Sequence, residues 1–158
     1  MKIGVLSDTH LREVTPGLRA IYDMYLADMD LILHSGDIVS PKIVRFFSKK
    51  PLHCVHGNMD PPELKEILPR KRVLELGTYR LGLIHGWGVS QGIEDRLRPE
   101  FSNVDIIVYG HSHRAANHVS DGVLFFNPGT ATGFSSAGVQ SIGILELGDS
   151  VHADIIIL

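Results

Sequence analysis

The first part of the chain alternates short apolar runs with stretches of helical periodicity, and this order restricts the fold more than any other feature. The apolar runs read as buried strands at residues 3–6, 31–33 and 52–55, separated by helices at residues 16–27, 41–48 and 61–68. This strand–helix–strand order is typical of parallel strands joined by helices. The sequence therefore predicts an α/β fold.

The second part of the chain reads as strands joined by tight turns. Residues 72–76 and 80–84 flank Gly77-Thr78, which predicts a hairpin. A helix at residues 91–100 is followed by strands at residues 104–109, 123–126, 142–147 and 151–158. Together the two parts predict a mixed sheet, or two sheets packed face to face. We expect a single domain covering residues 1–158.

Composition indicates a globular domain and argues against several kinds of partner. Hydrophobic residues make up 44% of the chain, which suits one domain with a substantial core. The net charge of −3 gives no basic surface for extended nucleic acid. Cys54 is the only cysteine, so no internal disulfide can form. The early first apolar run leaves no room for a signal peptide, and no run is long enough to span a membrane, so we expect a cytoplasmic protein.

Five of the expected strands end in residue types that bind metal ions. Ligand sites in open α/β sheets form where the carboxyl ends of parallel strands meet, so we expect these side chains to lie close together. The set comprises Asp8, His10, Asp37, Asn58, His85, His111 and His113.

The candidate ligands comprise four imidazoles, two carboxylates and one amide oxygen. Seven ligands exceed what one tetrahedral ion uses, but they suit two ions that share a carboxylate, since each of its oxygens can serve a different metal. The set contains no thiolate, which argues against a zinc finger or an iron–sulfur cluster. Mixed nitrogen and oxygen ligation suits Mn, Fe, Co, Ni or Zn, and the sequence does not choose among them.

The same residues carry a family resemblance. They lie in Asp8-x-His10, Gly36-Asp37, Gly57-Asn58-x-Asp60, His85-Gly86 and Gly110-His111-x-His113. These segments resemble, in order, the five motifs of the calcineurin-like metallophosphoesterases. Asn127-Pro128-Gly129 resembles the segment that follows in the small, single-domain phosphodiesterase branch.

The resemblance implies a four-layer α/β/β/α sandwich with two mixed sheets and a two-metal site along the sheet edges. One divalent ion would be held by Asp8, His10, Asp37 and His113, and the other by Asp37, Asn58, His85 and His111. Asp37 would bridge the ions, Asn58 and His111 would also contact the phosphate, and Asp60 would support the ligands. Mn²⁺ is the first expectation, with Ni²⁺, Co²⁺, Fe²⁺ or Zn²⁺ as alternatives.

The implied activity is hydrolysis of small phosphodiesters by attack of a metal-bridging hydroxide, with no covalent enzyme intermediate. One alternative is a non-catalytic protein-binding module like the retromer subunit on the same fold, although such a module has no need of all seven ligands. Another is a small nuclease, for which the chain has little space to build a tracking surface. The sequence does not decide whether the chain forms a homo-oligomer.

Two residues depart from the family pattern. Many members place a histidine after Gly-Asn, where it assists the leaving group, but this chain has Met59, which cannot donate a proton. The phosphodiesterase branch often has a second histidine after His85-Gly86, but this chain has Trp87. The indole of Trp87 could contact the substrate by stacking or by donating a hydrogen bond.

Overall fold

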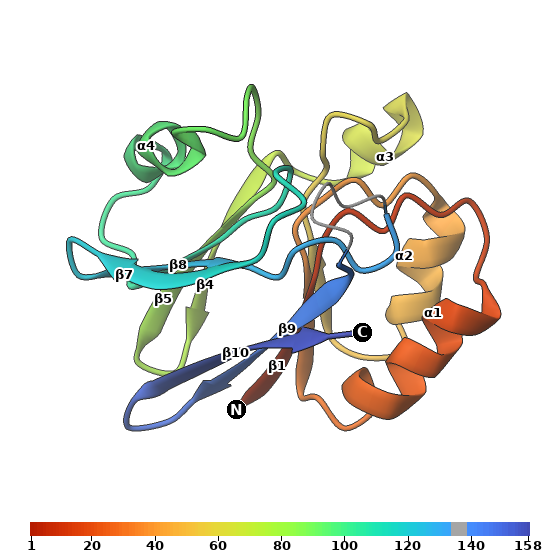
Figure 1. Ribbon diagram of the computed structural model, residues 1–158, viewed down its shortest axis with the longest axis horizontal. Helices are drawn as coiled ribbons and strands as arrows, with labels where there is room; N and C mark the ends of the chain where they lie inside the picture. Colours follow the sequence, from red (N-terminus) through yellow and green to blue (C-terminus); the bar gives the residue numbers. More distant parts are fainter. Residues whose placement is uncertain (134–138) are drawn as a thin grey trace.

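The computed structural model describes residues 1–133 and 139–158. Two five-stranded sheets pack face to face, and helices cover the outer face of each (Figure 1). Both sheets combine parallel and antiparallel pairs. The architecture confirms the expected four-layer α/β/β/α sandwich. Within the described residues, no helix has both the length and the apolar character needed to cross a bilayer.

The first sheet carries the parallel strands of the N-terminal part. Its strands are, in spatial order, β10 (Val151–Ile157), β9 (Ser141–Leu147), β1 (Lys2–Leu6), β2 (Leu31–His34) and β3 (Leu52–Cys54). Its outer face packs against α1 (Pro16–Ile21), the π-helix η1 (Tyr22–Leu26), α2 (Pro41–Phe47) and α3 (Pro62–Ile67). As expected from the sequence, α1 begins after Thr15, whose Oγ1 accepts a hydrogen bond from the Leu18 N–H at 3.1 Å.

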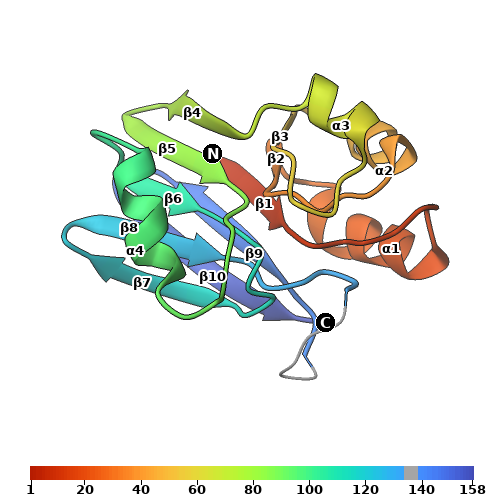
Figure 2. The same cartoon turned by 90° about the horizontal axis from the view of Figure 1, so that it is seen from above.

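The second sheet is built around the predicted hairpin. Its strands are, in spatial order, β4 (Lys71–Leu76), β5 (Tyr79–Ile84), β6 (Ile106–Val108), β8 (Val123–Asn127) and β7 (Ala116–Ser120). The short helix α4 (Ile93–Leu97) continues as the 3₁₀ turn η2 (Arg98–Glu100) and covers the outer face (Figure 2).

Alternation along the central strands divides the core into three layers. Val5 and Leu33 point toward the second sheet, whereas Leu6 and Ile32 point toward the helices. All four side chains are buried because the strands are covered on both faces. The third layer lies between the second sheet and α4.

The sequence missed β7 and misplaced several boundaries. Among the strands that the structure describes, β7 pairs only with β8. Most of its side chains are exposed, and it lacks the apolar run that marks the other strands. The expected helix at 91–100 begins at Ile93 and tightens to a 3₁₀ turn at Arg98, where Pro99 follows.

His34 ends β2 as a completely buried histidine. Its Nδ1 accepts a hydrogen bond from the Gly36 N–H at 3.2 Å, so Nε2 carries the proton and faces Thr9 Oγ1 at 3.3 Å. Burial lowers the pKa of His34 to about 3. The side chain is therefore neutral at pH 7 and fixes the turn that leads from β2 toward Asp37.

We predict that His34 makes the metal-free protein sensitive to acid. Its folded pKa lies below the unfolded value, so the unfolded chain takes up the proton first, and stability is lost as the pH falls from about 6.5 toward 3. Urea unfolding with a chelator should show that the native protein loses about 2 kcal/mol more between pH 7 and pH 5 than His34→Gln does. The exposed control His152→Gln should retain the native dependence. Equal losses in all three proteins would contradict this role.

Candidate metal centre

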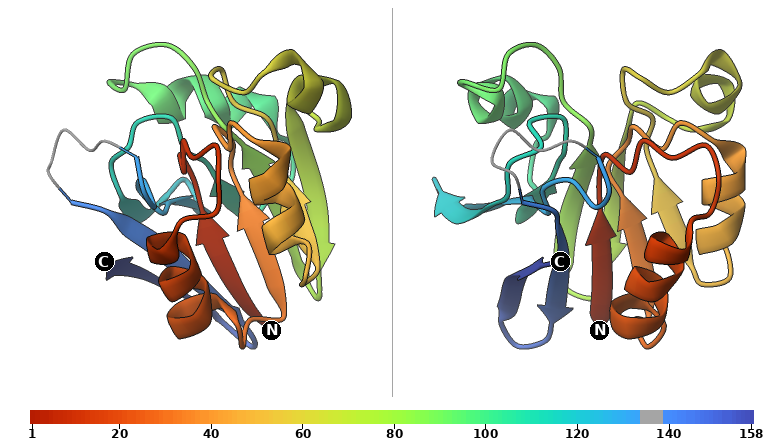
Figure 3. Two further views of the ribbon diagram at one scale, coloured as in Figure 1. Left: turned by 90° about the vertical axis from the view of Figure 1, so that its right-hand side faces the viewer. Right: turned by 45° about the vertical axis from the view of Figure 1, so that its right-hand side comes forward.

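The loops after β1, β2, β3, β5 and β6 meet at one edge of the sandwich. In Figure 3 the red and orange arrows of β1 and β2 both point to this edge. Backbone hydrogen bonds join neighbouring loops, from Asp8 N to Gly36 O at 3.0 Å and from Gly110 N to His85 O at 3.0 Å. These loops bring together all seven side chains that the sequence singled out, namely Asp8, His10, Asp37, Asn58, His85, His111 and His113.

Five of these seven residues have left-handed backbone conformations. Their φ angles are 53° at Asp8, 48° at His10, 53° at Asp37, 67° at His111 and 54° at His113. A residue with a side chain is held in this region only where its surroundings enforce it, at a cost of about 1 kcal/mol or more. Their concentration at one sheet edge makes this edge the candidate functional site.

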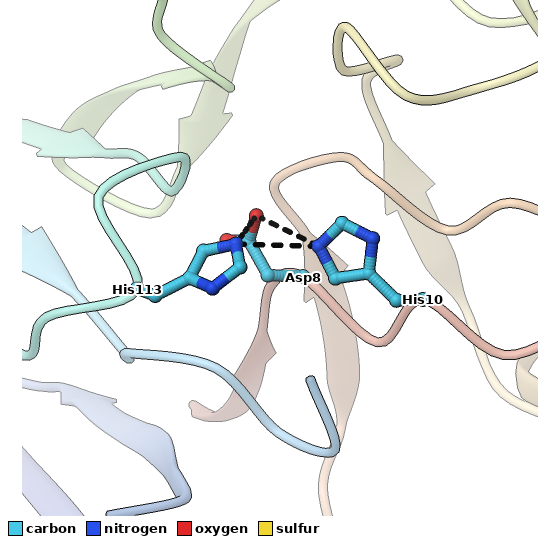
Figure 4. A group of neighbouring side chains, drawn as sticks. All are labelled: Asp8, His10 and His113. Atoms are coloured by element: carbon cyan, nitrogen blue, oxygen red, sulfur yellow. Dashed lines mark hydrogen bonds and ion pairs between the residues drawn. The ribbon is translucent and has the colours of Figure 1, made fainter. Parts of the chain in front are cut away.

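One cluster is formed by Asp8, His10 and His113 (Figure 4). Asp8 Oδ1 lies 3.1 Å from His113 Nε2 and 3.6 Å from His10 Nε2. The two imidazole Nε2 atoms are 3.2 Å apart. Three potential ligand atoms thus converge on one point from the loops after β1 and β6.

The two oxygens of Asp8 have different surroundings. Oδ2 accepts hydrogen bonds from Ser7 Oγ at 2.5 Å and from the His111 N–H at 3.1 Å. Oδ1 is buried and accepts no hydrogen bond within the described part of the chain. Burial alone would raise the pKa of Asp8, but the imidazoles of His10 and His113 outweigh it and hold the pKa well below its usual value. Asp8 is therefore a carboxylate with one oxygen held and the other available to a cation.

Asp37, like Asp8, has one oxygen held by a hydrogen bond and the other turned toward imidazoles. Its Oδ1 accepts a hydrogen bond from the Met59 N–H at 2.7 Å, whereas Oδ2 faces His85 Nε2 at 3.3 Å and His10 Nε2 at 3.7 Å. Burial raises the pKa of Asp37, but contact with His85 outweighs it and the net shift is downward. From the sequence we expected each oxygen of a bridging carboxylate to serve a different ion. In the structure, Asp37 Oδ2 faces imidazoles of both halves of the site, whereas Oδ1 accepts a backbone hydrogen bond.

Asn58, His85 and His111 form the other side of the centre. Asn58 Oδ1 lies 3.2 Å from His85 Nε2 and 2.9 Å from His111 Nδ1. The opposite ring nitrogens face carbonyl oxygens that can only accept, at 2.7 Å from Ser35 O for His85 Nδ1 and 2.7 Å from Gly88 O for His111 Nε2. Each of those nitrogens therefore donates, and a neutral ring turns its lone pair toward the amide oxygen of Asn58. The lone pairs of His85 Nε2 and His111 Nδ1 and the amide oxygen of Asn58 could thus all bind one cation placed between them.

The raised pKa of His85 also indicates that the centre favours a cation. Burial lowers the pKa of this imidazole, but the carboxylates of Asp37 and Asp8 outweigh burial and raise it. The centre thus favours a positive charge at His85 Nε2, which a proton or a metal ion can provide.

Asp60 ties two site loops together through backbone hydrogen bonds. Its Oδ2 accepts from the Gly57 N–H at 2.7 Å and the Asp37 N–H at 3.1 Å, and its Oδ1 accepts from the Val39 N–H at 2.6 Å. Both oxygens are thus engaged, and the side chain is buried behind the candidate ligands.

Two glycines allow the loops to approach this closely. A Cβ at Gly57 would lie 2.2 Å from Asp37 Oδ1, and a Cβ at Gly110 would lie 1.9 Å from Ser7 Oγ. A side chain at Gly57 would displace the Asp37 carboxylate, and a side chain at Gly110 would displace the Ser7 hydroxyl that binds Asp8.

Several groups that hold the site from a distance were not expected from the sequence. Thr130 Oγ1 donates to the Asp8 backbone carbonyl at 2.8 Å from far along the chain. Arg96 of α4 donates to the carbonyls of Trp87 at 3.1 Å, Gln91 at 3.0 Å and Gly92 at 3.0 Å. These contacts bind backbone carbonyls, so only Thr130, which directly follows Asn127-Pro128-Gly129, had a signal in the sequence.

Met59 and Trp87 occupy different surroundings. The Met59 side chain is 60% exposed, and only its backbone N–H reaches the centre. Trp87 is partly buried, and the guanidinium of Arg70 lies 4.6 Å from the centre of its ring.

Similarity to known proteins agrees with this geometry. The sequence pattern of the calcineurin-like phosphoesterase superfamily domain matches residues 1–150. A probable metallophosphoesterase of Methanothermobacter thermautotrophicus is 34% identical over 161 residues, which cover 99% of this chain and 92% of the relative. A solved archaeal phosphodiesterase is 26% identical, with a TM-score of 0.81 and 100% of both chains covered. Wild-type Vps29 of Entamoeba histolytica, solved in complex with Zn²⁺, shares the fold at 24% identity, with a TM-score of 0.73 over 99% of each chain.

The match of the family pattern over nearly the whole chain and the relative at 34% identity lead to one conclusion. The chain belongs to the calcineurin-like phosphoesterase superfamily.

Proposed function

We propose that this phosphoesterase is a phosphodiesterase that hydrolyses small phosphodiesters with two divalent metal ions, Mn²⁺ first among them. The observation that carries the proposal is the opposed pair of buried carboxylates, each with one oxygen held by the protein and one turned toward imidazole nitrogens. Asp8 Oδ1 and Asp37 Oδ2 lie 4.0 Å and 3.3 Å from the same atom, His85 Nε2. Two buried carboxylates this close to each other require compensating positive charge.

The donor set fits two ions better than one. His10 and His113 converge on Asp8, whereas His85 and the amide oxygen of Asn58 lie on the other side of Asp37. The mixture of imidazole nitrogens and hard oxygens suits Mn²⁺, Ni²⁺, Co²⁺, Fe²⁺ or Zn²⁺. Asp37 Oδ2 faces both halves, which supports Asp37 as the shared ligand.

The residues of the chain divide the catalytic work. Bound divalent ions would supply an activated water as nucleophile and would stabilise charge on the phosphoryl oxygens. Asn58 is the most exposed of the seven side chains, and His111 lies beside it, so these two are placed to meet the phosphate. Asp60 and the carbonyls that hold His85 and His111 keep the ligands oriented before the substrate arrives.

A second candidate is a protein-binding module, favoured by the structural likeness to Vps29. That likeness lies below 25% identity and shows the fold alone. Because Vps29 of Entamoeba histolytica was itself solved with Zn²⁺, metal binding does not separate the two candidates. Hydrolysis of a phosphodiester by the purified protein would distinguish the enzyme from the protein-binding module.

We predict that hydrolysis depends on bound metal. Treatment with a chelator should abolish hydrolysis of bis(4-nitrophenyl) phosphate, and added Mn²⁺, Ni²⁺ or Co²⁺ should restore it, because the nucleophile in this proposal is a water activated by the bound ions. The release of 4-nitrophenolate measures the rate. Full activity in protein shown to be metal-free by elemental analysis would reject the proposal.

Replacement of the shared ligand should be the most damaging single change. Asp37→Asn removes a full negative charge from both halves of the site, so we expect fewer than two ions per chain and a rate loss larger than about 100-fold, which is the upper range for residues that only support a ligand. The exposed Asp28→Asn makes the same chemical change away from the site and serves as the control. An Asp37→Asn protein with two ions and a normal rate would contradict the bridging role.

The exposed Met59 side chain should leave the departing oxygen without an acid. We predict a steep dependence of rate on leaving-group pKa across a series of phosphodiesters at saturating metal, with aryl esters far ahead of alkyl esters. Met59→His should flatten this dependence and mainly accelerate poor leaving groups, by up to about 10²-fold. Met24→His, at a methionine that is 69% exposed on η1, is the matched control. A flat dependence in the native protein, with chemistry rate-limiting, would show that another residue gives the proton.

A further inference from the structure

Among the described residues, one hollow is lined by candidate metal ligands and a second lies beside Ser112, and the two differ in charge. One, of about 390 Å³, reaches the centre through Asn58 and His85; we call it the cationic pocket. The remaining residues that line it are His56, Gly57, Lys65, Arg70, Ile84, Gly86 and Trp87, with no Asp or Glu. The other hollow, of about 510 Å³, includes Glu94 and Asp95 in its lining. In a chain of net charge −3, the acid-free hollow is the one suited to an anion.

Lys65 places a free cation at the rim of the cationic pocket. It lies on α3, and its Nζ donates to the backbone carbonyl of Asn58 at 2.8 Å. This bond holds the ammonium beside a candidate metal ligand. Among the described residues, no carboxylate lies within ion-pair distance of Lys65, although Glu63 and Glu66 share its helix. The charge is therefore available to a ligand.

Arg70 has a different part in the pocket. Its two terminal nitrogens bind the Glu100 carboxylate at 2.9 Å and 3.2 Å, so its guanidinium is held in an ion pair, in which Lys71 Nζ shares Glu100 Oε2 at 2.9 Å. Its guanidinium lies over the Trp87 ring at 4.6 Å, and the Trp87 carbonyl is held by Arg96 at 3.1 Å. These contacts position Trp87 in the lining of the pocket.

We infer that the cationic pocket binds one ester arm of the substrate, and that this arm is a flat ring carrying a second anionic group. The ring would pack along Trp87 and the apolar floor at Ile84, and the anion would pair with Lys65. Lys65 is then the residue that determines specificity for phosphodiesters with an additional carboxylate or phosphate. The inference rests on the proposed phosphodiesterase function.

A pair of symmetric diesters tests this specificity regardless of which arm enters the pocket. The probes are bis(4-nitrophenyl) phosphate and bis(3-carboxy-4-nitrophenyl) phosphate, and the measured quantity is the ratio of kcat/KM for the carboxylated over the plain diester. Lys65→Met should lower this ratio by about tenfold, mainly through KM, since it removes one charge-assisted contact. Lys65→Arg should retain most of the ratio. Lys2→Met, which removes the same charge at the opposite end of β1, should leave the ratio unchanged.

A ratio that does not respond to Lys65→Met would overturn the inference while leaving the phosphodiesterase intact. Failure of all diesters to react would instead reject the proposed function.

Binding can be measured without turnover, because Trp87 is the only tryptophan in the chain. In metal-free protein kept with a chelator, 3-nitrobenzoate should quench the fluorescence saturably and more tightly than neutral 3-nitrobenzamide. Lys65→Met should weaken the affinity for nitrobenzoate about tenfold and bring it close to that for nitrobenzamide. Equal quenching by the two probes in the native protein would overturn the inference.

Discussion

The burial of Asp8 and Asp37 around one imidazole is the constraint on which the rest of the site depends. Each carboxylate has one oxygen bound by the protein and the other turned toward histidine nitrogens. The negative charge of Asp8 also acts against ionisation of Asp37, and both remain ionised because imidazoles face them. The short hydrogen-bonded turns, the close glycines and the strained backbone all hold these two groups in place against their repulsion.

The two-sheet architecture explains how one point can draw ligands from five loops. Parallel strands in the first sheet bring the loops after β1, β2 and β3 to one edge, and face-to-face packing places the loops after β5 and β6 opposite them. The sheets are joined at this edge by the hydrogen bond from His111 N to Asp8 Oδ2. A shift of one sheet along the other would therefore disrupt both halves of the metal centre, because each half takes side chains from both sheets.

The sequence predicted those features that depend on local pattern. Apolar runs followed by Asp8, Asp37 or His85 predicted both the strands and the edge at which the site lies. The exposed edge strand β7 has no such run, and the use of a single Asp37 oxygen depends on where the Met59 N–H falls after folding. The Arg96 contacts were equally out of reach, since an arginine on a short helix carries no sign of the carbonyls it will meet.

The left-handed conformations of Asp8, His10, Asp37, His111 and His113 have a consequence for how proteins of this fold diverge. Such conformations and buried charges lower stability unless a bound cation offsets them. A descendant released from catalysis can therefore gain stability by replacing the opposed charges together, whereas the loss of a single partner leaves a buried charge uncompensated. Selection for a robust scaffold and selection for turnover pull on the same few positions in opposite directions.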